Sequence, residues 1–545
     1  MGGVVRGALL VVFIGDAFRD GDSGTARSSV AKPFPWFRIL SLPVPSANLK
    51  LFISLRFYFF FRVTKITRKN NSSWKTVFHM ESVGSTHKKQ HDEDDIINML
   101  PESVISHILS FLPTKDAVRT SVLSKRWIDN WTLITKVKLD DGLFYSPKRK
   151  KSGGKQIFIT FVNRVLFLTS YSLESFSFTI NNEYDLTLLN TWIACILKKS
   201  VKHIRINSNF EFPLSALTSY YLFSHSSSLK KLVLEMCCCA IEVPSIKSTF
   251  YFKSLKQLRL WEIIFNIDNS LGLNLNLPLL KTFETENCTW LCANNEGVTI
   301  EAPLLKSVYI LQGHTCVSRE PHSCTIKFSA SCMADFTYCG YGGILEPIVL
   351  SNPSAACNAS ANINLYSYQG GYVEETGSCV CLLLEQFSQV QFMKFQGSEV
   401  LMQQNVTMLP LFVMLSYLEL RLVTGKVLIS LLQKSPVLKT LVIERIYGFD
   451  QETLNSSVVP DCLATTLGVV KFNKVDGDKD IVLYLAKFFM ENAMVLERMS
   501  FSWYLEVKSK EIKEFKEKVF SFKKRVSLII LEFLHDYVTL EYGFI

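Results

Sequence analysis

"LKKLVL" at residues 229–234 and "LKQLRL" at residues 255–260 decide how most of this chain folds. Both follow the pattern L-x-x-L-x-L, where L is any apolar residue, and the same unit recurs along most of the chain. The units begin at Leu173, Val201, Leu229, Leu255, Leu280, Leu305, Met333, Ser360, Val390, Leu415, Leu438, Leu467 and Leu496. Successive starts are between 23 residues (415 to 438) and 30 residues (360 to 390) apart, and the unit at Ser360 is a weak copy.

A period in the twenties with one short strand pattern per unit is the sequence signature of leucine-rich repeats. Each unit buries its apolar face only against its neighbours, so the units stack into a solenoid. We therefore predict an α/β fold over residues 165–458, with a curved parallel sheet and helices or loops on its convex side. The least regular stretch is 340–390, where we expect a break or distortion. The alternative is an irregular α/β domain with chance periodicity.

Asn or Cys recurs three residues past the last apolar position of several units. Asn181, Asn209, Cys237 and Cys288 occupy this position. We expect these side chains to bond the backbone of the turn that follows each strand, inside the solenoid.

A second pattern precedes the repeats, in "LPESVISHILSFLPTKDAVRTSVLSKRWIDNW" at residues 100–131. Apolar residues spaced three and four apart predict a helix of about three turns, with Pro101 in its first turn. Pro113 should end it, and Thr114 should cap a second helix whose apolar stripe runs to Trp131. This pair of helices has more apolar surface than it can cover by itself, which is typical of an interface.

The order of Leu-Pro, Ile-Leu, Leu-Pro, Val-Leu-Ser-Lys-Arg-Trp and a final Trp in this segment resembles an F-box of the plant type, which we place at residues 94–140. The resemblance implies binding to a Skp-type adaptor and, through it, to a cullin-based ubiquitin ligase. The alternative is a generic amphipathic hairpin that caps a larger domain. The expected adaptor-binding residues are Leu100, Pro101, Val104, Ile105, Ile108, Leu109, Leu112, Pro113, Val122, Leu123 and Trp127.

The C-terminal part adds to this resemblance. Repeats behind an F-box are similar to plant F-box/leucine-rich-repeat (LRR) proteins, and residues 459–503 resemble the FBD region that often closes such chains. Residues 504–545 depart from the family. They contain a helical pattern with Ile512, Phe515 and Val519 on one face, which we expect to cap the last repeat.

The net charge of +10 is concentrated at the N-terminus. Residues 1–79 hold 12 Lys+Arg and 3 Asp+Glu, whereas the remaining residues hold 47 and 46. The folded body is therefore nearly neutral, which argues against a nucleic-acid partner. The apolar runs of the leader are shorter than the roughly 20 residues of a membrane helix, so we expect no membrane contact. We predict that residues 1–93 form a disordered or atypical extension, dispensable up to Met80.

The 14 cysteines lie between Cys195 and Cys462, and three of them, at 237–239, are contiguous. This usage is typical of reduced thiols in the cytoplasm or nucleus. A secreted LRR recognition protein is the rival interpretation, based on the leader and on N-x-S/T sequons such as the one at Asn287.

No enzyme motif is present: we find no phosphate-binding glycine loop, no G-x-S-x-G and no H-E-x-x-H. We predict no catalytic residue, cofactor or metal. "HTCVSREPHSC" offers His314, Cys316, His322 and Cys324, but their spacing matches no zinc module.

These patterns predict a non-catalytic substrate receptor of a Skp-cullin-F-box (SCF) ligase. An F-box/LRR protein acting outside a ligase is the alternative. Because strand side chains alternate, residues between the apolar positions should face out of the solenoid and bind a protein target. The candidates are His203, Arg205, Arg259, Trp261, Glu284 and Tyr309.

Overall fold

The structure of the protein is a computed structural model. The chain divides into two units, Met1–Val83 and Gly84–Ile545, and every described residue belongs to the second. The predicted extension at residues 1–93 therefore lies outside the described residues. The structure describes residues 100–535 apart from 124, 146–150, 170–171, 225–226, 245–248, 269–271, 293–296, 314–323, 342–346, 354–358, 367–373, 398–399, 402–405, 448–457, 476–478, 504–508 and 527.

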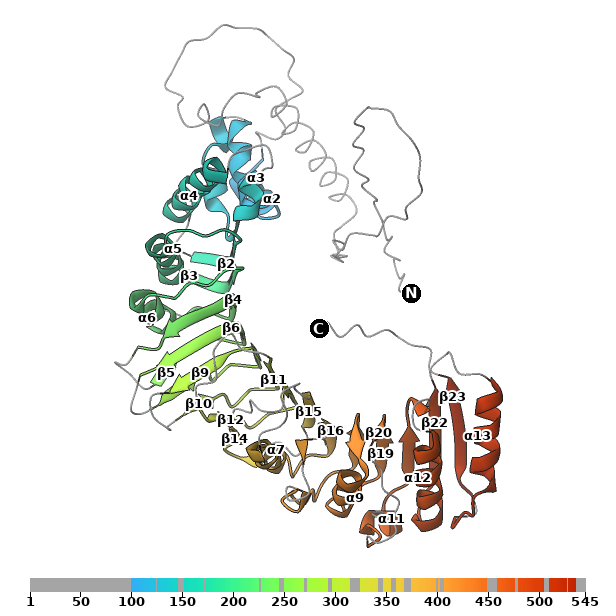
Figure 1. Cartoon of the computed structure of the whole chain (residues 1–545). Helices are drawn as coiled ribbons and strands as arrows, with labels where there is room; N and C mark the ends of the chain where they lie inside the picture. The colour runs from blue at the N-terminus through green and yellow to red at the C-terminus, as the bar shows by residue number, and fades with distance from the viewer. Residues whose placement is uncertain are drawn as a thin grey trace, which may run out of the picture. The chain divides into compact units, whose positions relative to one another are not determined.

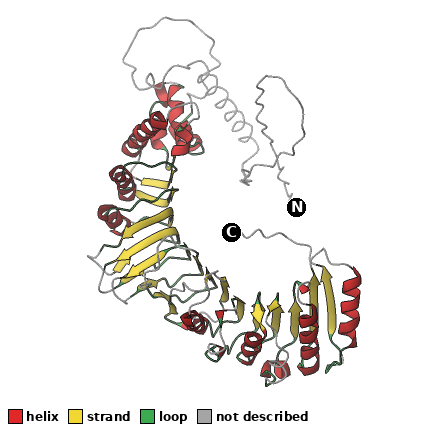
Figure 2. Ribbon diagram, viewed as in Figure 1, coloured by secondary structure: helices red, strands yellow, loops and turns green. Residues whose placement is uncertain are grey.

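One parallel sheet of 16 strands runs along the inner side of the curved solenoid (Figures 1 and 2). Fifteen strands follow one another in chain order, and β9 (Thr289–Cys292) pairs with β6 beside them. The others are β1 (Lys136–Asp140), β2 (Ser172–Ile180), β3 (Ser200–Ser208), β4 (Lys231–Glu242), β6 (Gln257–Ile267), β8 (Thr282–Glu286), β11 (Ser307–Gln312), β13 (Asp335–Tyr341), β15 (Ser360–Tyr366), β16 (Phe392–Gln396), β17 (Tyr417–Leu420), β19 (Thr440–Ile443), β21 (Val469–Phe472), β22 (Arg498–Trp503) and β23 (Ile530–His535).

The repeat pattern explains each strand. In β3, for example, Val201, Ile204 and Ile206 are buried while the residues between them are exposed or half-buried. Register is kept from unit to unit, since Ile204 pairs with Leu232 and Leu232 pairs with Leu258. Stacked apolar side chains thus form one continuous core. The predicted curved repeat solenoid is confirmed, and all 13 units place a strand in the sheet.

The convex side differs from the expectation in its middle. Helices cover both ends of the sheet (Figure 2), but a second parallel sheet of five strands covers the repeats between them. Those connections carry alternating apolar residues, such as Leu273 with Leu275 and Val298 with Ile300, a pattern that favours a strand over a helix.

The helices of the convex side are α4 (Lys151–Leu168), α5 (Leu186–Lys198), α6 (Ala216–Ser224), α7 (Glu374–Gln386), α9 (Gly425–Gln433), α11 (Asp461–Thr465), α12 (Lys479–Asn492) and α13 (Ser509–Ser521). The second sheet has β5 (Thr249–Tyr251), β7 (Leu273–Asn276), β10 (Val298–Glu301), β12 (Ile326–Ser329) and β14 (Ile348–Leu350), and a two-stranded sheet has β18 (Val423–Thr424) and β20 (Ile446–Tyr447).

The expected break at 340–390 is wrong for the main sheet. Strands β13, β15 and β16 pair continuously across it, with Phe336 beside Ala361 and Ala361 beside Met393. The irregularity of the sequence falls on the connections instead, parts of which lie outside the described residues.

The front of the chain is helical, but its first helix has eight residues, fewer than the predicted three turns, and Pro101 is its N-cap residue. After α2 (Glu102–Leu109) and the short α3 (Thr114–Arg119), the chain continues as 3-10 turns η2 (Thr120–Val122), η3 (Lys125–Trp127) and η4 (Asn130–Leu133). Thr114 does not cap α3, because its Oγ1 accepts a hydrogen bond of 2.7 Å from the backbone N–H of Lys138 in β1. Contact with the sheet thus replaces the local cap and joins the front segment to the solenoid.

A buried carboxylate strengthens this junction. Asp141, in the turn η5 (Asp141–Phe144) after β1, is fully buried. Its Oδ1 accepts from the backbone N–H and side-chain Nδ2 of Asn181 at 2.9 and 2.8 Å. Its Oδ2 accepts the equivalent pair from Asn182, each at 2.9 Å. A buried carboxylate is stable where donors surround it in this way, so Asp141 ties the front segment to the first repeat.

The expected role of the Asn column is only partly correct. Asn209 Nδ2 donates to Asn181 Oδ1 at 2.8 Å, which links two successive repeats. Both residues are exposed and do not lie inside the solenoid.

The C-terminal part extends the sheet. Helix α13 buries Ile512, Phe515 and Val519, which confirms the predicted apolar face. Strand β23 then pairs with β22, and Phe501 stacks on Phe533 at 5.4 Å between ring centroids. The tail is therefore one more helix–strand unit of the solenoid. Among the described residues, no helix combines the length and apolar character needed to cross a membrane.

Candidate functional site

The predicted adaptor-binding residues separate into an interior set and an exposed set. Ile105, Leu109 and Trp127 are fully buried within the chain, so their assignment to a contact surface is corrected: they form the core of the F-box segment. Leu100, Ile108, Leu112 and Leu123 are half-buried or lie at the margin of the segment, while Pro101, Val104, Pro113 and Val122 lie on its outer side. Helical geometry explains the division, because Ile105 and Leu109 share one side of α2 and Val104 lies beside them on its outer side.

We define the F-box face as the large apolar side chains left exposed on this segment. They are Val104 (40%), Phe111 (45%), Val122 (48%), Ile128 (45%) and Leu133 (45%). Two side-chain hydrogen bonds hold its parts together, from Ser106 Oγ to the Leu133 carbonyl and from Ser121 Oγ to the Ile128 carbonyl, each 3.1 Å.

Sequence reasoning does not single out Phe111, Ile128 and Leu133. Phe111 has a usable signal, since it lies seven residues after Val104 on the same helical stripe. Ile128 and Leu133 have none, because they depend on 3-10 turns where a longer helix is expected.

The predicted target-binding residues come from strands β3, β6, β8 and β11 of the inner sheet face. His203, Arg205, Arg259 and Glu284 line one hollow of about 380 Å³, together with Lys231, Glu235 and Gln257. Trp261 (37% exposed) and Tyr309 lie on the same sheet but do not line this hollow. The structure thus brings four of the six residues together.

Glu235, which the sequence did not single out, is central to this group. Its carboxylate is buried, and its Oε2 accepts from Arg205 Nη2 at 2.7 Å, Arg205 Nε at 3.2 Å and Asn207 Nδ2 at 3.1 Å. Arg259 Nε lies 3.9 Å from the other oxygen, Oε1. Glu235 therefore holds the two arginines at fixed positions.

Two further carboxylates complete the network. Arg259 Nη2 donates to Glu286 Oε1 at 3.0 Å, and Arg259 Nη1 lies 3.8 Å from Glu284 Oε2. We call Arg205, Glu235, Arg259, Glu284 and Glu286 the concave charged patch. Its charges alternate across adjacent strands and are paired with one another, which suits recognition of a polar surface of matching charge pattern.

Burial is the main cause of the pKa shifts of His203 and Tyr309, which lie near the patch. Burial lowers the pKa of His203, Glu174 opposes this, and Lys231, Lys230 and Lys202 add to the lowering. Burial likewise raises the pKa of Tyr309. The lysine contributions to the His203 shift show that positive charge is concentrated at the start of these strands.

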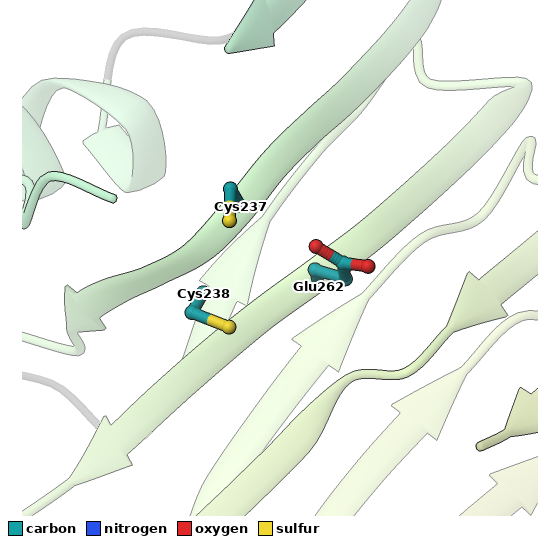
Figure 3. A group of neighbouring side chains, drawn as sticks. All are labelled: Cys237, Cys238 and Glu262. Carbon is teal, nitrogen blue, oxygen red and sulfur yellow. The ribbon is translucent and has the colours of Figure 1, made fainter. Parts of the chain in front are cut away.

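One cluster in the described part of the chain resembles a metal centre: Cys237 and Cys238 of β4 and Glu262 of β6, whose ligand atoms lie within 4.8 Å of one another (Figure 3). Left-handed backbone at Cys238 (φ 45°) and Glu262 (φ 53°) brings them together. Cys238 is disulfide-bonded, however, and the thiolate is the form that binds metals. Two remaining ligands are fewer than the four of a structural zinc site.

The second predicted metal-like group falls mostly outside the described residues, because His314, Cys316 and His322 lie there. The absence of a metal stays a prediction. Cys324 is described, and it forms a disulfide with Cys292.

The expectation that all cysteines are reduced is therefore wrong for Cys238, Cys292 and Cys324. Cys292 ends β9 and Cys324 precedes β12, so stacking of successive repeats brings their Cα atoms to 5.6 Å. Other cysteines follow the prediction of small buried apolar residues: burial raises the pKa of both Cys239 and Cys462 to about 12.

Comparison with known proteins agrees with this arrangement. Residues 97–132 match the F-box domain family and residues 455–501 match the FBD family. The F-box/FBD/LRR-repeat protein At3g14710 of Arabidopsis thaliana is 30% identical over 421 residues, covering 74% of this chain and 87% of the relative. The putative F-box/FBD/LRR-repeat protein At3g59240 and the F-box/LRR-repeat protein At4g14096, from the same plant, are 26% and 24% identical over 74% of this chain and 83% and 87% of their own lengths. The chain therefore belongs to the plant F-box/FBD/LRR-repeat protein family.

Proposed function

We propose that this protein is the substrate-recognition subunit of an SCF-type ubiquitin ligase. The observation that carries the proposal is the F-box face: five large apolar side chains, each 40–48% exposed, above a fully packed interior. Exposed apolar groups gathered on a small segment favour a protein partner. F-box domains generally bind Skp-type adaptors, and the adaptor links to a cullin.

The repeats supply the second half of the function. The concave charged patch fixes arginines and carboxylates on a rigid sheet, which favours binding of a protein target there. Ubiquitin transfer is carried out by the partner subunits, and this chain contributes proximity by raising the effective concentration of target near the ubiquitin carrier. In this proposal the protein is not an enzyme.

The hydrogen-bonded junction supports this division of roles. Asp141 and Thr114 join the F-box segment to the first repeats through partly buried hydrogen bonds. A target held by the repeats would then keep a constant position relative to the adaptor.

We place the protein in the cytoplasm or nucleus, since its proposed partners act there and most described cysteines are free. The disulfide of Cys292 with Cys324 favours the secreted alternative. A fluorescent fusion of the full chain separates the two: cytoplasmic or nuclear signal supports the proposal, and signal in the secretory pathway contradicts it.

The direct test is pull-down of a Skp-type adaptor by the full chain. We expect Val104→Asp with Phe111→Asp to lower adaptor retention at least about tenfold, the equivalent of about 1.4 kcal/mol. The matched control is Leu217→Asp with Leu304→Asp, which places the same charges at exposed apolar positions (59% and 41%) of the repeats. Equal retention by both double variants would contradict the assignment.

Co-purification of a cullin distinguishes a ligase subunit from an F-box protein that acts outside a ligase. If the adaptor is retained but no cullin co-purifies, the protein is an F-box interaction protein without a ligase. Co-purification of adaptor and cullin together supports the proposal.

A further inference from the structure

Five lysines occupy the same position in five successive repeats, immediately after the first apolar residue of each unit. We call them the lysine row: Lys202, Lys230, Lys256, Lys281 and Lys306. From Lys230 onwards, the backbone N–H of each donates to the carbonyl of the one before, at 2.7, 2.8, 2.8 and 2.9 Å in chain order. The row is therefore fixed by the sheet itself.

All five side chains are exposed, at the end where the strands begin. Neighbouring strands lie about 4.8 Å apart, so the row extends over roughly 19 Å. The row stops at Glu174 on one side, which pairs with Lys136 at 3.5 Å, and at Ala334 on the other, whose N–H bonds the Lys306 carbonyl.

The row has no acidic partner within the described part of the chain, where no ion pair involves any of the five. On β4 and β8, the carboxylates of Glu235, Glu284 and Glu286 are engaged by Arg205 and Arg259. Like charges at this spacing repel one another. Lys202 and Lys230 also help to lower the pKa of His203, after burial as the main cause.

We propose that the lysine row binds an acidic segment of the protein target. This inference rests on the proposed function, because it names the chemistry of the target. A line of positive charge that the chain itself does not neutralise complements a line of carboxylates, and such complementarity steers association and fixes register.

The surroundings favour an acidic protein segment over a nucleic acid. Apart from β4, where exposed Lys231 follows Lys230, the row is one residue wide, and the carboxylates of Glu284 and Glu286 lie further along β8, where they repel a phosphate backbone. Side chains on one face of an extended segment are about 6.6–7 Å apart. The flexible four-carbon stems of lysine accommodate the difference from the spacing of the row.

The test uses the full chain bound to its Skp-type adaptor and three fluorescent probes. They are a ten-residue peptide of alternating Glu and Ser, its Gln and Ser counterpart, and a ten-nucleotide oligothymidylate. We expect the Glu peptide to bind, the Gln peptide to bind at least about tenfold more weakly, and affinity to fall with salt. Fluorescence anisotropy gives each dissociation constant.

The decisive variant is Lys230→Glu, Lys256→Glu and Lys281→Glu. We expect it to weaken Glu-peptide binding at least about tenfold, the equivalent of about 1.4 kcal/mol. Its matched control changes three exposed lysines outside the row, Lys327→Glu, Lys487→Glu and Lys513→Glu, which alters net charge equally. We expect the control to stay within about twofold of the wild type, because screening limits distant charges.

Several results would overturn the proposal: no binding of the Glu peptide, equal weakening by the control, or tighter binding of oligothymidylate. A milder triple variant with Gln at the same three positions guards against misfolding, and an unchanged affinity in that variant also overturns the proposal. Adaptor pull-down is measured in parallel. If the adaptor is retained while the row has no effect, the row inference falls and the proposed function stands.

Discussion

The F-box face and the concave charged patch both lie on the surface, but the first is apolar and the second consists of charged side chains that already pair with one another. The F-box face carries Val104, Phe111 and Val122, each 40–48% exposed. The patch carries Arg205 and Arg259 already paired with carboxylates of the same sheet. The first surface gains free energy when a partner removes water from it, whereas the second must exchange existing ion pairs for new ones. We therefore expect the F-box face to bind the adaptor with high affinity. We expect the patch to determine which target protein is bound.

The largest expected effect separates the interior of the F-box from its face. Trp127→Ala removes a fully buried side chain and should lower the free energy of unfolding by about 3–5 kcal/mol. Phe111→Ala, at an exposed position, should change it by less than about 0.5 kcal/mol. Denaturant unfolding of the two variants measures both values. Equal losses would show that our division into interior and face is incorrect.

Asp141→Asn tests the junction between the two regions. The substitution replaces an oxygen that accepts two hydrogen bonds with an amide donor facing other donors, so we expect a loss of about 2–3 kcal/mol. Thermal unfolding gives the shift. Asp140→Asn, at the neighbouring and more exposed carboxylate, is the control. A loss no greater than that of the control would contradict the role of Asp141.

Glu235→Gln tests whether the patch is held from within. The amide keeps the shape but removes the charge that positions Arg205 and Arg259, so we expect about 1 kcal/mol less stability. Adaptor retention should remain that of the wild type, because the patch and the F-box face are separate surfaces. Loss of adaptor binding in this variant would contradict that separation.

The smallest effect concerns the buried thiols. Burial raises the pKa of Cys239 and Cys462 to about 12, above the ordinary value of 9.0. Protonated thiols are poor nucleophiles, so an alkylating reagent at pH 8 should label the exposed Cys195 and Cys332 first. The stability from this burial is complete below about pH 9 and is lost as the pH rises towards 12. Mass spectrometry of labelled peptides checks the order, and early labelling of Cys462 would contradict the burial.

The repeats could be predicted because their signal is local and recurs. Each unit shows its three apolar positions within six residues, and the strands of the sheet follow those positions. The F-box motif could be found because its signal is also local, within residues 100–131. Its split into interior and face could not, since 3-10 turns replace the expected second helix after α3.

Pairing between repeats is the main limit on prediction from the sequence. Arg205 reaches Glu235 across 30 residues, and strand register, not a local pattern, brings the two side chains together. The disulfide between Cys292 and Cys324 arises from the same stacking. On the convex side we expect helices or loops from the sequence, but the middle repeats carry a second sheet. The alternating apolar residues Leu273 and Leu275 do indicate a strand there.

Hydrogen–deuterium exchange of the full chain with and without a Skp-type adaptor tests the central claim most directly. We predict that the adaptor slows exchange in peptides spanning residues 102–133, where the F-box face lies, and leaves strands β3 to β8 unchanged. Slower exchange confined to β3–β8, or no change in residues 102–133, would contradict the account.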